Sequence, residues 1–336
     1  MKTSLKDIAE TLKLSKTTIS WVLSGKGDEK GISLATQEKV FQCVKQLNYQ
    51  PNLLARSLNT GISGTIGLII PDITDSFYSK VARSIEKEAE TQGYSLMICS
   101  SESEIERENR MIRLFKAKQV DGIIVAPTKV SKIEIQNLVK EGYPLVLFDR
   151  YFPEMQTNYI IIDNEGSSYE LVKKMIDNGS SKIAIITTNP HLRTMNMRRE
   201  GYARALIEAN LPVDPDLYGE VTFVDYEKNV FKTLDQIFSK VPDVDGFFFT
   251  THILALEAFR YFYEKGININ KGYELACIHG VSAFRVLAPN MNIARMPIEE
   301  IGKNAVRILL GDIKYRLENS TEKKEVETLV LPCSLP

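Results

Sequence analysis

Four side chains in this 336-residue sequence stand out by their rarity and by the chemistry that they could do. His191, His252 and His279 are the only histidines, and an imidazole can donate, accept or bind a proton near neutral pH. Trp21 is the only tryptophan, and its indole presents one hydrogen-bond donor beside a large apolar face. It lies in the stretch SKTTISWVLS, whose serines and threonines can both donate and accept hydrogen bonds.

Patterns that would indicate catalysis or metal binding are missing from the sequence. There is no nucleophile elbow, no histidine pair at metal spacing and no glycine-rich motif that cradles phosphates. The four cysteines, Cys43, Cys99, Cys277 and Cys333, include no C-x-x-C pair, which disfavours a zinc knuckle and a disulfide framework. We therefore expect no enzyme, no metal and no cofactor.

Trp21 falls in the second of three short helices predicted for residues 1–50, which we call the head. Ser15 can cap the second helix and Ser33 the third. The first two helices are joined by a tight turn, which is typical of a helix-turn-helix. The predicted core residues are Leu5, Ile8, Ala9 and Leu12 from the first helix, Ile19, Val22 and Leu23 from the second, and Val40, Phe41, Val44 and Leu47 from the third.

A helical wheel gives the direction of the indole. At about 100° per residue, Ile19, Val22 and Leu23 share one face of the second helix. Trp21 lies within about 40° of Thr17 on the same wheel and far from Ile19. The indole is therefore predicted to face away from the core of the head.

The charge distribution distinguishes the head from the rest of the chain. The whole chain has a net charge of −1, but residues 1–60 hold nine Lys and Arg against five Asp and Glu. Residues 61–336 hold 33 against 38. A small basic head on a mildly acidic body favours a DNA-contacting module attached to another domain.

From residue 65 onward, apolar strand-like runs alternate with helical stretches. One series runs from TIGLIIP to PLVLFDR, and a second runs from NYIIIDN to YELACIHG. Buried strands with helical crossovers predict two α/β lobes with parallel sheets and a cleft at the strand carboxyl ends, where ligands bind. Helices are expected over residues 76–93, 168–178, 198–209 and 229–238.

The beginning of the sequence lacks the apolar core of a secretory signal, and its longest uncharged apolar run, residues 65–71, is too short to span a bilayer. We therefore expect a cytoplasmic protein without a membrane partner. The expected domains are a helix-turn-helix domain over 1–50, a hinge helix and linker over 51–62, and a two-lobed core over 63–336.

Several motifs together resemble the lactose/galactose-repressor (LacI/GalR) family of bacterial transcription regulators. They are SLKDIAETLKLSKTTISWVLSGK, LNYQPNLLARSL, VDGIIVAP, VLFDR, RREGYARAL and MPIEEIGKNAVRILL. The resemblance implies type I periplasmic-binding-protein-like lobes that bind a small effector. It also implies a homodimer whose two heads occupy successive major grooves of a pseudo-palindromic operator.

The resemblance assigns DNA contacts. Lys16, Thr17 and Trp21 fall at base-reading positions, and Trp21 replaces the arginine usual in the family, so it would read a thymine methyl or the groove shape. The alternative is that Trp21 folds back against the head or a neighbouring loop. Further DNA-binding residues implied by the family are Ser4, Ser15, Thr18, Ser20 and Ser24, with Asn52 in the linker and Leu58 as a minor-groove wedge. Ordinary capping is the alternative for any one of the hydroxyls.

The loop after the second helix is about three residues longer than is usual in the family, by comparison of GKGDEKGIS with the family pattern. DNA contacts that the family makes from this loop are therefore not transferred to Lys26 and Lys30.

The resemblance also implies effector contacts. Asp149 and Arg198 match the positions that bind hydroxyl and carboxylate groups, and Phe77 and Tyr78 would form an aromatic wall. The family's A-N-D and G-F-D-D motifs are replaced by TTH and CIHG, so His252 and His279 stand where carboxylates usually bind sugar hydroxyls.

Together with His191, these histidines predict a site rich in donors and short of acceptors, with groups that titrate near neutral pH. Arg198 and either Arg150 or Arg193 would add further donors. We expect an anionic effector, such as a sugar acid or a phosphorylated sugar. A neutral sugar, with one or more histidines serving only in packing, is the alternative.

A repressor is the leading functional prediction, with an activator of the same family as the alternative. A sugar-binding transport protein would share the lobes but not the basic head. The sequence shows no leucine-heptad tail after the core, so a dimer is expected.

Overall fold

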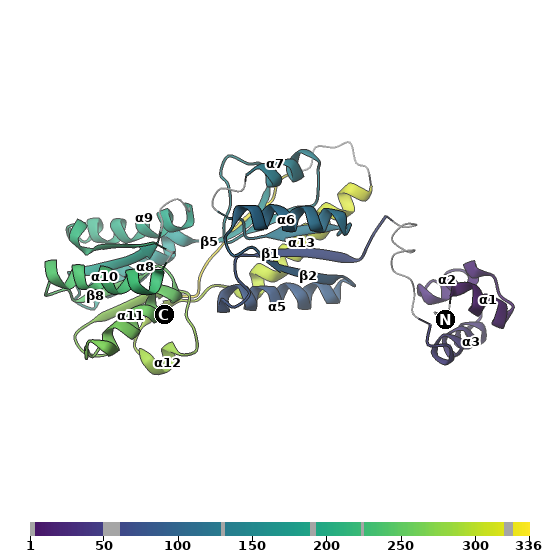
Figure 1. Ribbon diagram of the computed structural model, residues 1–336, viewed down its shortest axis with the longest axis horizontal. Helices are drawn as coiled ribbons and strands as arrows, with labels where there is room; N and C mark the ends of the chain where they lie inside the picture. The colour runs from purple at the N-terminus through teal and green to yellow at the C-terminus, as the bar shows by residue number, and fades with distance from the viewer. Residues whose placement is uncertain (1–3, 50–60, 129–131, 189–192, 223–224, 319–324) are drawn as a thin grey trace. The chain divides into compact units, whose positions relative to one another are not determined.

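The computed structural model describes residues 4–49, 61–128, 132–188, 193–222, 225–318 and 325–336 (Figure 1). The chain divides into two compact units, Met1–Ser63 and Gly64–Pro336. The predicted hinge helix falls almost wholly on residues 50–60, which lie outside the described residues.

The head consists of α1 (Leu5–Leu12), α2 (Lys16–Leu23) and α3 (Leu34–Gln46). The side chains of Ser15 and Ser33 cap α2 and α3, which confirms both predicted caps. Lys13 ends α1 in the left-handed region (φ 51°), so the chain reverses within three residues before α2. The buried core is formed by Ile8, Ala9, Ile19, Val22, Val40 and Cys43.

The prediction for α3 was wrong at Phe41, whose side chain is 51% exposed. Val40 and Cys43 are buried and Val44 packs against them, a spacing of three and four residues along one helical face. Phe41 is turned by about 100° from Val40 and so leaves that face. Leu47 is the C-cap of α3, and its side chain is also exposed.

The first lobe of the second unit is built on a six-stranded sheet in the order β11-β5-β4-β3-β1-β2, and every pairing is parallel. The strands are β1 (Thr65–Ile70), β2 (Ser95–Ser100), β3 (Gly122–Val125), β4 (Leu145–Phe148), β5 (Asn158–Ile162) and β11 (Thr328–Leu331). Its helices are α5 (Ser76–Thr91), α6 (Ile105–Ala117), α7 (Ile133–Lys140) and α13 (Ile298–Leu317).

Helices cover both faces of this sheet (Figure 1). Along β1, Ile66, Leu68 and Ile70 pack with residues of α5 and α13, whereas Ile69 packs with residues of α6 and α7. Successive side chains of a strand point to opposite faces, so the continuous apolar run TIGLII serves two cores.

The second lobe has a five-stranded parallel sheet in the order β10-β9-β8-β6-β7. Its strands are β6 (Ile183–Thr188), β7 (Tyr218–Val221), β8 (Gly246–Phe249), β9 (Glu274–Ile278) and β10 (Asn292–Ala294). Its helices are α8 (Asn164–Asp177), α9 (Arg193–Glu208), the 3-10 turn η1 (Pro215–Leu217), α10 (Tyr226–Lys240), α11 (His252–Glu264) and α12 (Phe284–Leu287). Helices α8 and α9 supply one core face, and α10 and α11 the other. Two parallel α/β lobes confirm the predicted fold class.

The predicted helix starts were late in three places, and in one of them the helix expected from residue 229 begins at Tyr226. The helix expected from residue 168 begins at Asn164, because Asp163 directly after β5 accepts the amide of Gly166 and caps it. The helix expected from residue 198 begins at Arg193.

The chain passes between the lobes at three places: after β5, after β10 and after β11. At the last two, Arg295 and Ser334 form a pair of backbone hydrogen bonds of 2.8 and 2.9 Å. Antiparallel bonding between the second and third crossings ties these segments into one connection.

The packing of α8 on α9 depends on Gly201. A Cβ added there would lie 2.2 Å from the carbonyl oxygen of Glu165 and 2.9 Å from the amide nitrogen of Tyr169. Both atoms belong to the backbone of α8, so they cannot move aside as a flexible side chain would.

Gly201→Ala is therefore expected to lower the free energy of unfolding by about 1–3 kcal/mol, the usual cost of overpacking. Gly311→Ala is the matched control, because Gly311 is also helical and has no atom within 4 Å of the added Cβ. The control should be neutral or gain about 0.5–1 kcal/mol from helix propensity. Urea denaturation followed by circular dichroism measures both, and equal stability of the two variants would contradict the close contact.

Candidate effector-binding cleft and DNA-contacting face

A cavity of about 290 Å³ lies between the lobes, at the carboxyl ends of both sheets. Its lining includes six of the seven residues predicted for the effector site. These are Phe77, Tyr78, Asp149, Arg198, His252 and His279. The seventh, His191, lies outside the described residues.

Two imidazoles meet on the second-lobe side of the cavity. His252 is the first residue of α11, and His279 follows β9 in the left-handed backbone region (φ 63°). Their ring centroids are 5.0 Å apart. Across the cleft, the ring of Phe77 lies 5.5 Å from that of His279, and Oδ1 of Asp75 lies 3.5 Å from Nε2 of His252. The two lobes therefore touch through aromatic and polar side chains at the cavity.

The expectation that these histidines titrate near neutral pH was wrong. Burial, and to a lesser extent the nearby His252, lowers the pKa of His279 to about 3. Burial also lowers the pKa of His252, against the attraction of Asp75. Burial raises the pKa of Asp75, against the same attraction. At pH 7 both imidazoles are neutral hydrogen-bonding groups, because neither can reach enough water or negative charge to hold a proton.

The prediction that the site is short of acceptors was also wrong. Asp75 and Asp149 both line the cavity. The hydroxyl of Tyr78 donates to Asp149 at 2.7 Å, and Nε of Arg150 lies 3.6 Å from the same carboxylate. Sequence reasoning missed Asp75, although an Asp directly before the SFYS helix is a recognisable N-cap, and its carboxylate does accept the amide of Phe77.

Arg198 is 3% exposed and is held rigidly. Its Nε donates to Oδ1 of Asn164 at 2.8 Å, and its Nη1 donates to the carbonyl oxygen of Thr250 at 2.5 Å. Two bonds hold the guanidinium in one orientation at the wall of the cavity, so its remaining N–H groups also have fixed directions.

Two buried polar atoms of the cavity wall point to a ligand more directly. Oγ1 of Thr188 and Nε2 of His279 have no hydrogen-bond partner among the residues that the structure describes. Both side chains are at most 5% exposed. A buried polar group without a partner costs about 1–3 kcal/mol, which a ligand with matching hydroxyl groups would recover. Thr188 ends β6 and was not singled out from the sequence.

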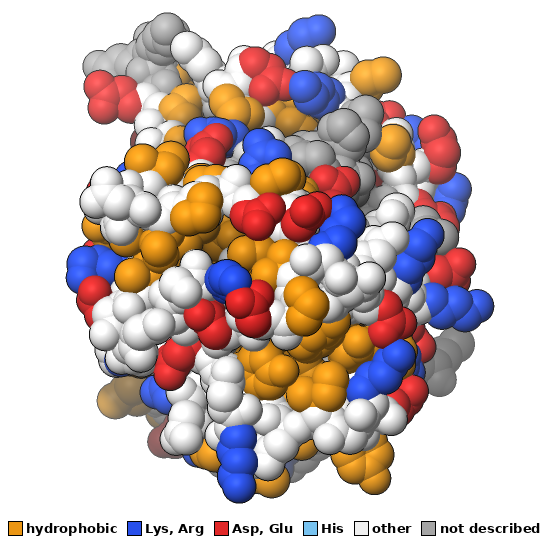
Figure 2. All heavy atoms as spheres, turned by 90° about the vertical axis from the view of Figure 1, so that its left-hand side faces the viewer, with side chains coloured by type: hydrophobic (Ala, Val, Ile, Leu, Met, Phe, Trp, Pro, Cys, Tyr) orange, Lys and Arg blue, Asp and Glu red, His pale blue; other side chains and the backbone are white. Residues whose placement is uncertain are grey.

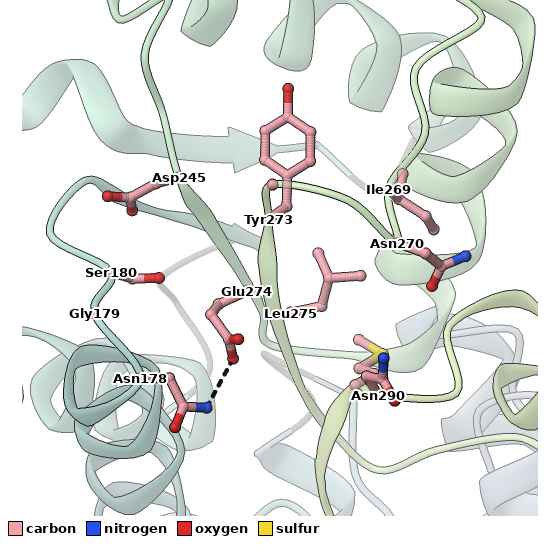
Figure 3. A pocket seen from close by; sticks show the side chains of 12 residues that line it. Asn178, Gly179, Ser180, Asp245, Ile269, Asn270, Tyr273, Glu274, Leu275 and Asn290 are labelled. Carbon is pink, nitrogen blue, oxygen red and sulfur yellow. Dashed lines mark hydrogen bonds between the residues drawn. The ribbon is translucent and has the colours of Figure 1, made fainter.

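A second cavity, of about 340 Å³, lies at the opposite, amino-terminal edge of the second sheet (Figure 3). Its acidic groups are satisfied by the protein: Asn178 donates to Glu274, as Figure 3 shows, and Asp245 accepts two backbone amides. It draws residues from one lobe and, among its described lining residues, includes no buried polar atom without a partner. The cleft between the lobes is therefore the stronger ligand site.

In the head, the exposed arc of α2 carries Lys16, Thr17, Ser20 and Trp21. Trp21 is 37% exposed and is absent from the buried core, which confirms its predicted direction. Nζ of Lys30 lies 5.8 Å from the indole centroid. The loop between α2 and α3 thus contacts the indole, and base reading by Trp21 stays a prediction.

The hydroxyls predicted to contact DNA also serve the fold. Ser4 and Asp7 form a reciprocal cap on α1, and Ser15 accepts the amide of Thr18 at 3.0 Å. The hydroxyl of Ser24 donates to the carbonyl oxygen of Trp21. DNA contact by these residues stays a prediction, and Asn52 and Leu58 lie outside the described residues.

The loop that is longer than in the resembled family, residues 25–32, packs closely. The side-chain amide of Gln37 donates to Asp28 and to the carbonyl oxygen of Ile32, both at 2.8 Å. Gly27 is buried under Gln37, where an added Cβ would lie 2.4 Å from the side chain. The insertion therefore forms a defined surface beside the indole.

In the view of Figure 2, Lys and Arg side chains are interspersed with Asp and Glu and with hydrophobic patches, and they do not form a continuous basic surface. No helix among the described residues is long and apolar enough to cross a membrane. Nor do the described residues hold a cluster of three metal-binding side chains.

A helix-turn-helix head joined to a two-lobed α/β domain with a polar cleft defines the class of ligand-responsive DNA-binding regulators. Residues 4–52 match the family described as bacterial regulatory proteins, lacI family. Residues 63–334 match the periplasmic binding proteins and sugar binding domain of the LacI family. The chain belongs to the LacI family of bacterial transcription regulators, whose members are not enzymes.

Several of its relatives are named as repressors. The chain is 30% identical to the ribose operon repressor of Halalkalibacterium halodurans over 97% of both chains. It is also 30% identical to the transcriptional repressor PurR of Aliivibrio fischeri, over 93% of this chain and 92% of that protein. The lac repressor dimer bound to operator and the anti-inducer ONPF shares the fold with a TM-score of 0.83 and 20% identity, over all of this chain and 98% of that one.

The pKa of His279 predicts how stability depends on pH. The unfolded chain binds a proton at this imidazole below about pH 6.5, but the folded chain does not until about pH 3, so lowering the pH favours unfolding. Between pH 7.5 and pH 5, the free energy of unfolding should fall by about 2 kcal/mol less in His279→Asn than in the wild type. Asparagine tolerates the left-handed backbone at this position. Urea unfolding of both proteins at the two pH values measures the difference, and an identical pH dependence would show that folding does not lower the pKa of His279.

Proposed function

We propose that this protein represses transcription by binding a pseudo-palindromic operator as a homodimer, with its operator affinity set by a small polar effector in the cleft. The observation that carries the proposal is the cavity between the lobes. It unites ionic, neutral and aromatic groups from both lobes in a chain that also carries a DNA-binding head. The names of its relatives support repression over activation.

The effector is a molecule of sugar size that bears several hydroxyl groups. Asp75 and Asp149 accept hydrogen bonds, Arg198 donates them, and the neutral His279 and Thr188 can each do either. Phe77 offers a ring for an apolar face of the ligand. This combination of paired acceptors, donors and an aromatic surface suits a polyhydroxylated ring, which presents alternating donors and acceptors around its edge.

Effector binding reaches the operator through the two lobes. The ligand groups belong to both lobes, and Asp75 already meets His252 across the cleft. A ligand bound to both sides would favour one angle between the lobes, and a change of angle would alter the separation of two linkers in a dimer. Operator and effector affinities are then reciprocally linked.

Specific DNA recognition comes from the exposed arc of α2. Lys16 and Thr17 lie at the start of this helix and Trp21 one turn further on, so they can enter a major groove together. Cationic and hydroxyl groups around them would contact phosphates and set the register. The transport-protein alternative does not account for residues 4–52.

Mapping the DNA that the purified protein binds, by selection from a random library, tests this function. A palindromic consensus with two half-sites is the expected result, because a two-fold dimer presents two equal heads. Binding to a reporter promoter carrying this consensus should lower expression in cells. Salt-sensitive binding to all sequences without a consensus would contradict the proposal.

Trp21→Ala is expected to weaken binding to the selected operator by about ten-fold or more without unfolding the head, because the indole lies outside the core. Ile19→Ala is the contrasting variant: Ile19 is fully buried, so its truncation should cost about 2–5 kcal/mol of stability. Trp21→Arg should change the consensus that is selected. If Trp21→Ala keeps full affinity, the indole only packs against the loop that contains Lys30.

A further inference from the structure

A smaller chamber of about 170 Å³ adjoins the cleft. The two cavities share Arg150 from the first lobe and Thr194 from the second. The chamber is several times larger than the share of one water in the liquid, about 30 Å³. A ligand in the cleft can therefore extend past these two residues into a second compartment.

The chamber is cationic. Lys132, Arg150 and Arg193 line it, and Glu154 is the one carboxylate among its described lining residues. The formal charge of this lining is thus +2, whereas the main cavity pairs its two arginines, Arg150 and Arg198, with several carboxylates. The two compartments differ in the chemistry that they favour.

The cations can exchange their present partners for a ligand. Lys132 pairs with Glu154, and Nη1 of Arg193 lies 2.7 Å from Glu200. All four of these side chains are about half exposed, and such pairs contribute only about 0–1 kcal/mol each. Little stability would be lost if both cations turned to an anion in the chamber.

Arg150 is fixed more firmly at the passage between the compartments. Its side chain is 16% exposed, its Nη1 donates to the carbonyl oxygen of Pro127 at 3.4 Å, and its Nε faces Asp149. Arg150 also forms a side-chain hydrogen bond with Tyr78, and its guanidinium presents a fork that suits phosphate oxygens.

The geometry points to this chamber as a subsite for a phosphate group, so that the effector is a sugar phosphate whose hydroxyl-bearing ring occupies the main cavity. A phosphate monoester carries about −1.5 to −2 charges at pH 7, which matches the lining. This inference rests on the proposed function, and it assigns the anion to Lys132, Arg150 and Arg193 instead of to the neutral histidines.

The same subsite would strengthen the link between the lobes. Lys132 and Arg150 belong to the first lobe, whereas Arg193 begins α9 of the second. A phosphate held by all three joins the lobes at a second point, apart from the contacts of the sugar ring. Sugar phosphates should therefore shift operator affinity more than their parent sugars do.

Calorimetry on the full-length protein tests the subsite with a panel of pentose and hexose phosphates, each beside its parent sugar and its sugar acid. At least one phosphate is expected to bind ten-fold or more tightly than its parent, and to lose affinity as salt is raised. The double variant Lys132→Gln, Arg193→Gln should abolish most of this preference while it keeps the affinity for the parent sugar.

The matched control is Arg204→Gln, Lys240→Gln, which removes two half-exposed cations that pair with Glu165 and Asp216 away from both cavities. It should bind the phosphates as the wild type does. Three results would each overturn the subsite. The parent sugar binds as tightly as its phosphate or more tightly, the sugar acid is preferred, or the preference for the phosphate survives the double variant. In those cases the proposed function stands, whereas a panel in which nothing binds contradicts the sugar effector itself.

Discussion

The parallel arrangement of both sheets is the constraint on which the rest of the molecule depends. In a parallel sheet, every strand ends at the same edge, so each lobe gathers its polar strand-end residues at one rim. The chain passes between the lobes three times, and the two rims consequently enclose one cavity. Asp149 after β4 and His279 after β9 both occupy left-handed backbone there, a conformation for which Asp and His are better suited than branched residues. The contact of Asp75 with His252 then joins the rims across the cavity.

Burial in this cavity decides the chemistry of its titratable groups. The same two histidines in water would carry part of their charge at pH 7, but in the cleft desolvation keeps both neutral, and at His252 it outweighs the attraction of Asp75. A neutral imidazole suits a hydroxyl group, whereas the cationic side chains beside it, in the smaller chamber, suit an anion. The main cavity thus favours a hydroxyl-bearing ring, and the smaller chamber favours an anion.

The sequence was sufficient for the architecture but not for the electrostatics of the site. The local sequence pattern predicted the caps of α2 and α3, the outward direction of Trp21 and the two α/β lobes. Each of these features depends on residues only a few positions apart in the sequence. The pattern failed at Phe41, where adjacent apolar residues left the helical face ambiguous. Asp75 lies beside His252, and Phe77 lies beside His279, although the residues of each pair are more than 170 positions apart in the sequence. The sequence pattern could not show that these residues would be buried together. Packing of Trp21 against a neighbouring loop was foreseen as an alternative, but the partner residue, Lys30, was not, because it reaches the indole through tertiary packing.

The central claim is that the cleft and the operator are coupled through one effector. The most direct test measures operator affinity with and without a saturating ligand, and ligand affinity with and without operator, in the same buffer. The emission of Trp21, the single tryptophan, reports events at the head. Both affinities are expected to change by the same factor, of about 5-fold or more, as linkage requires. A ligand that binds tightly in the cleft and leaves operator affinity unchanged would contradict the account.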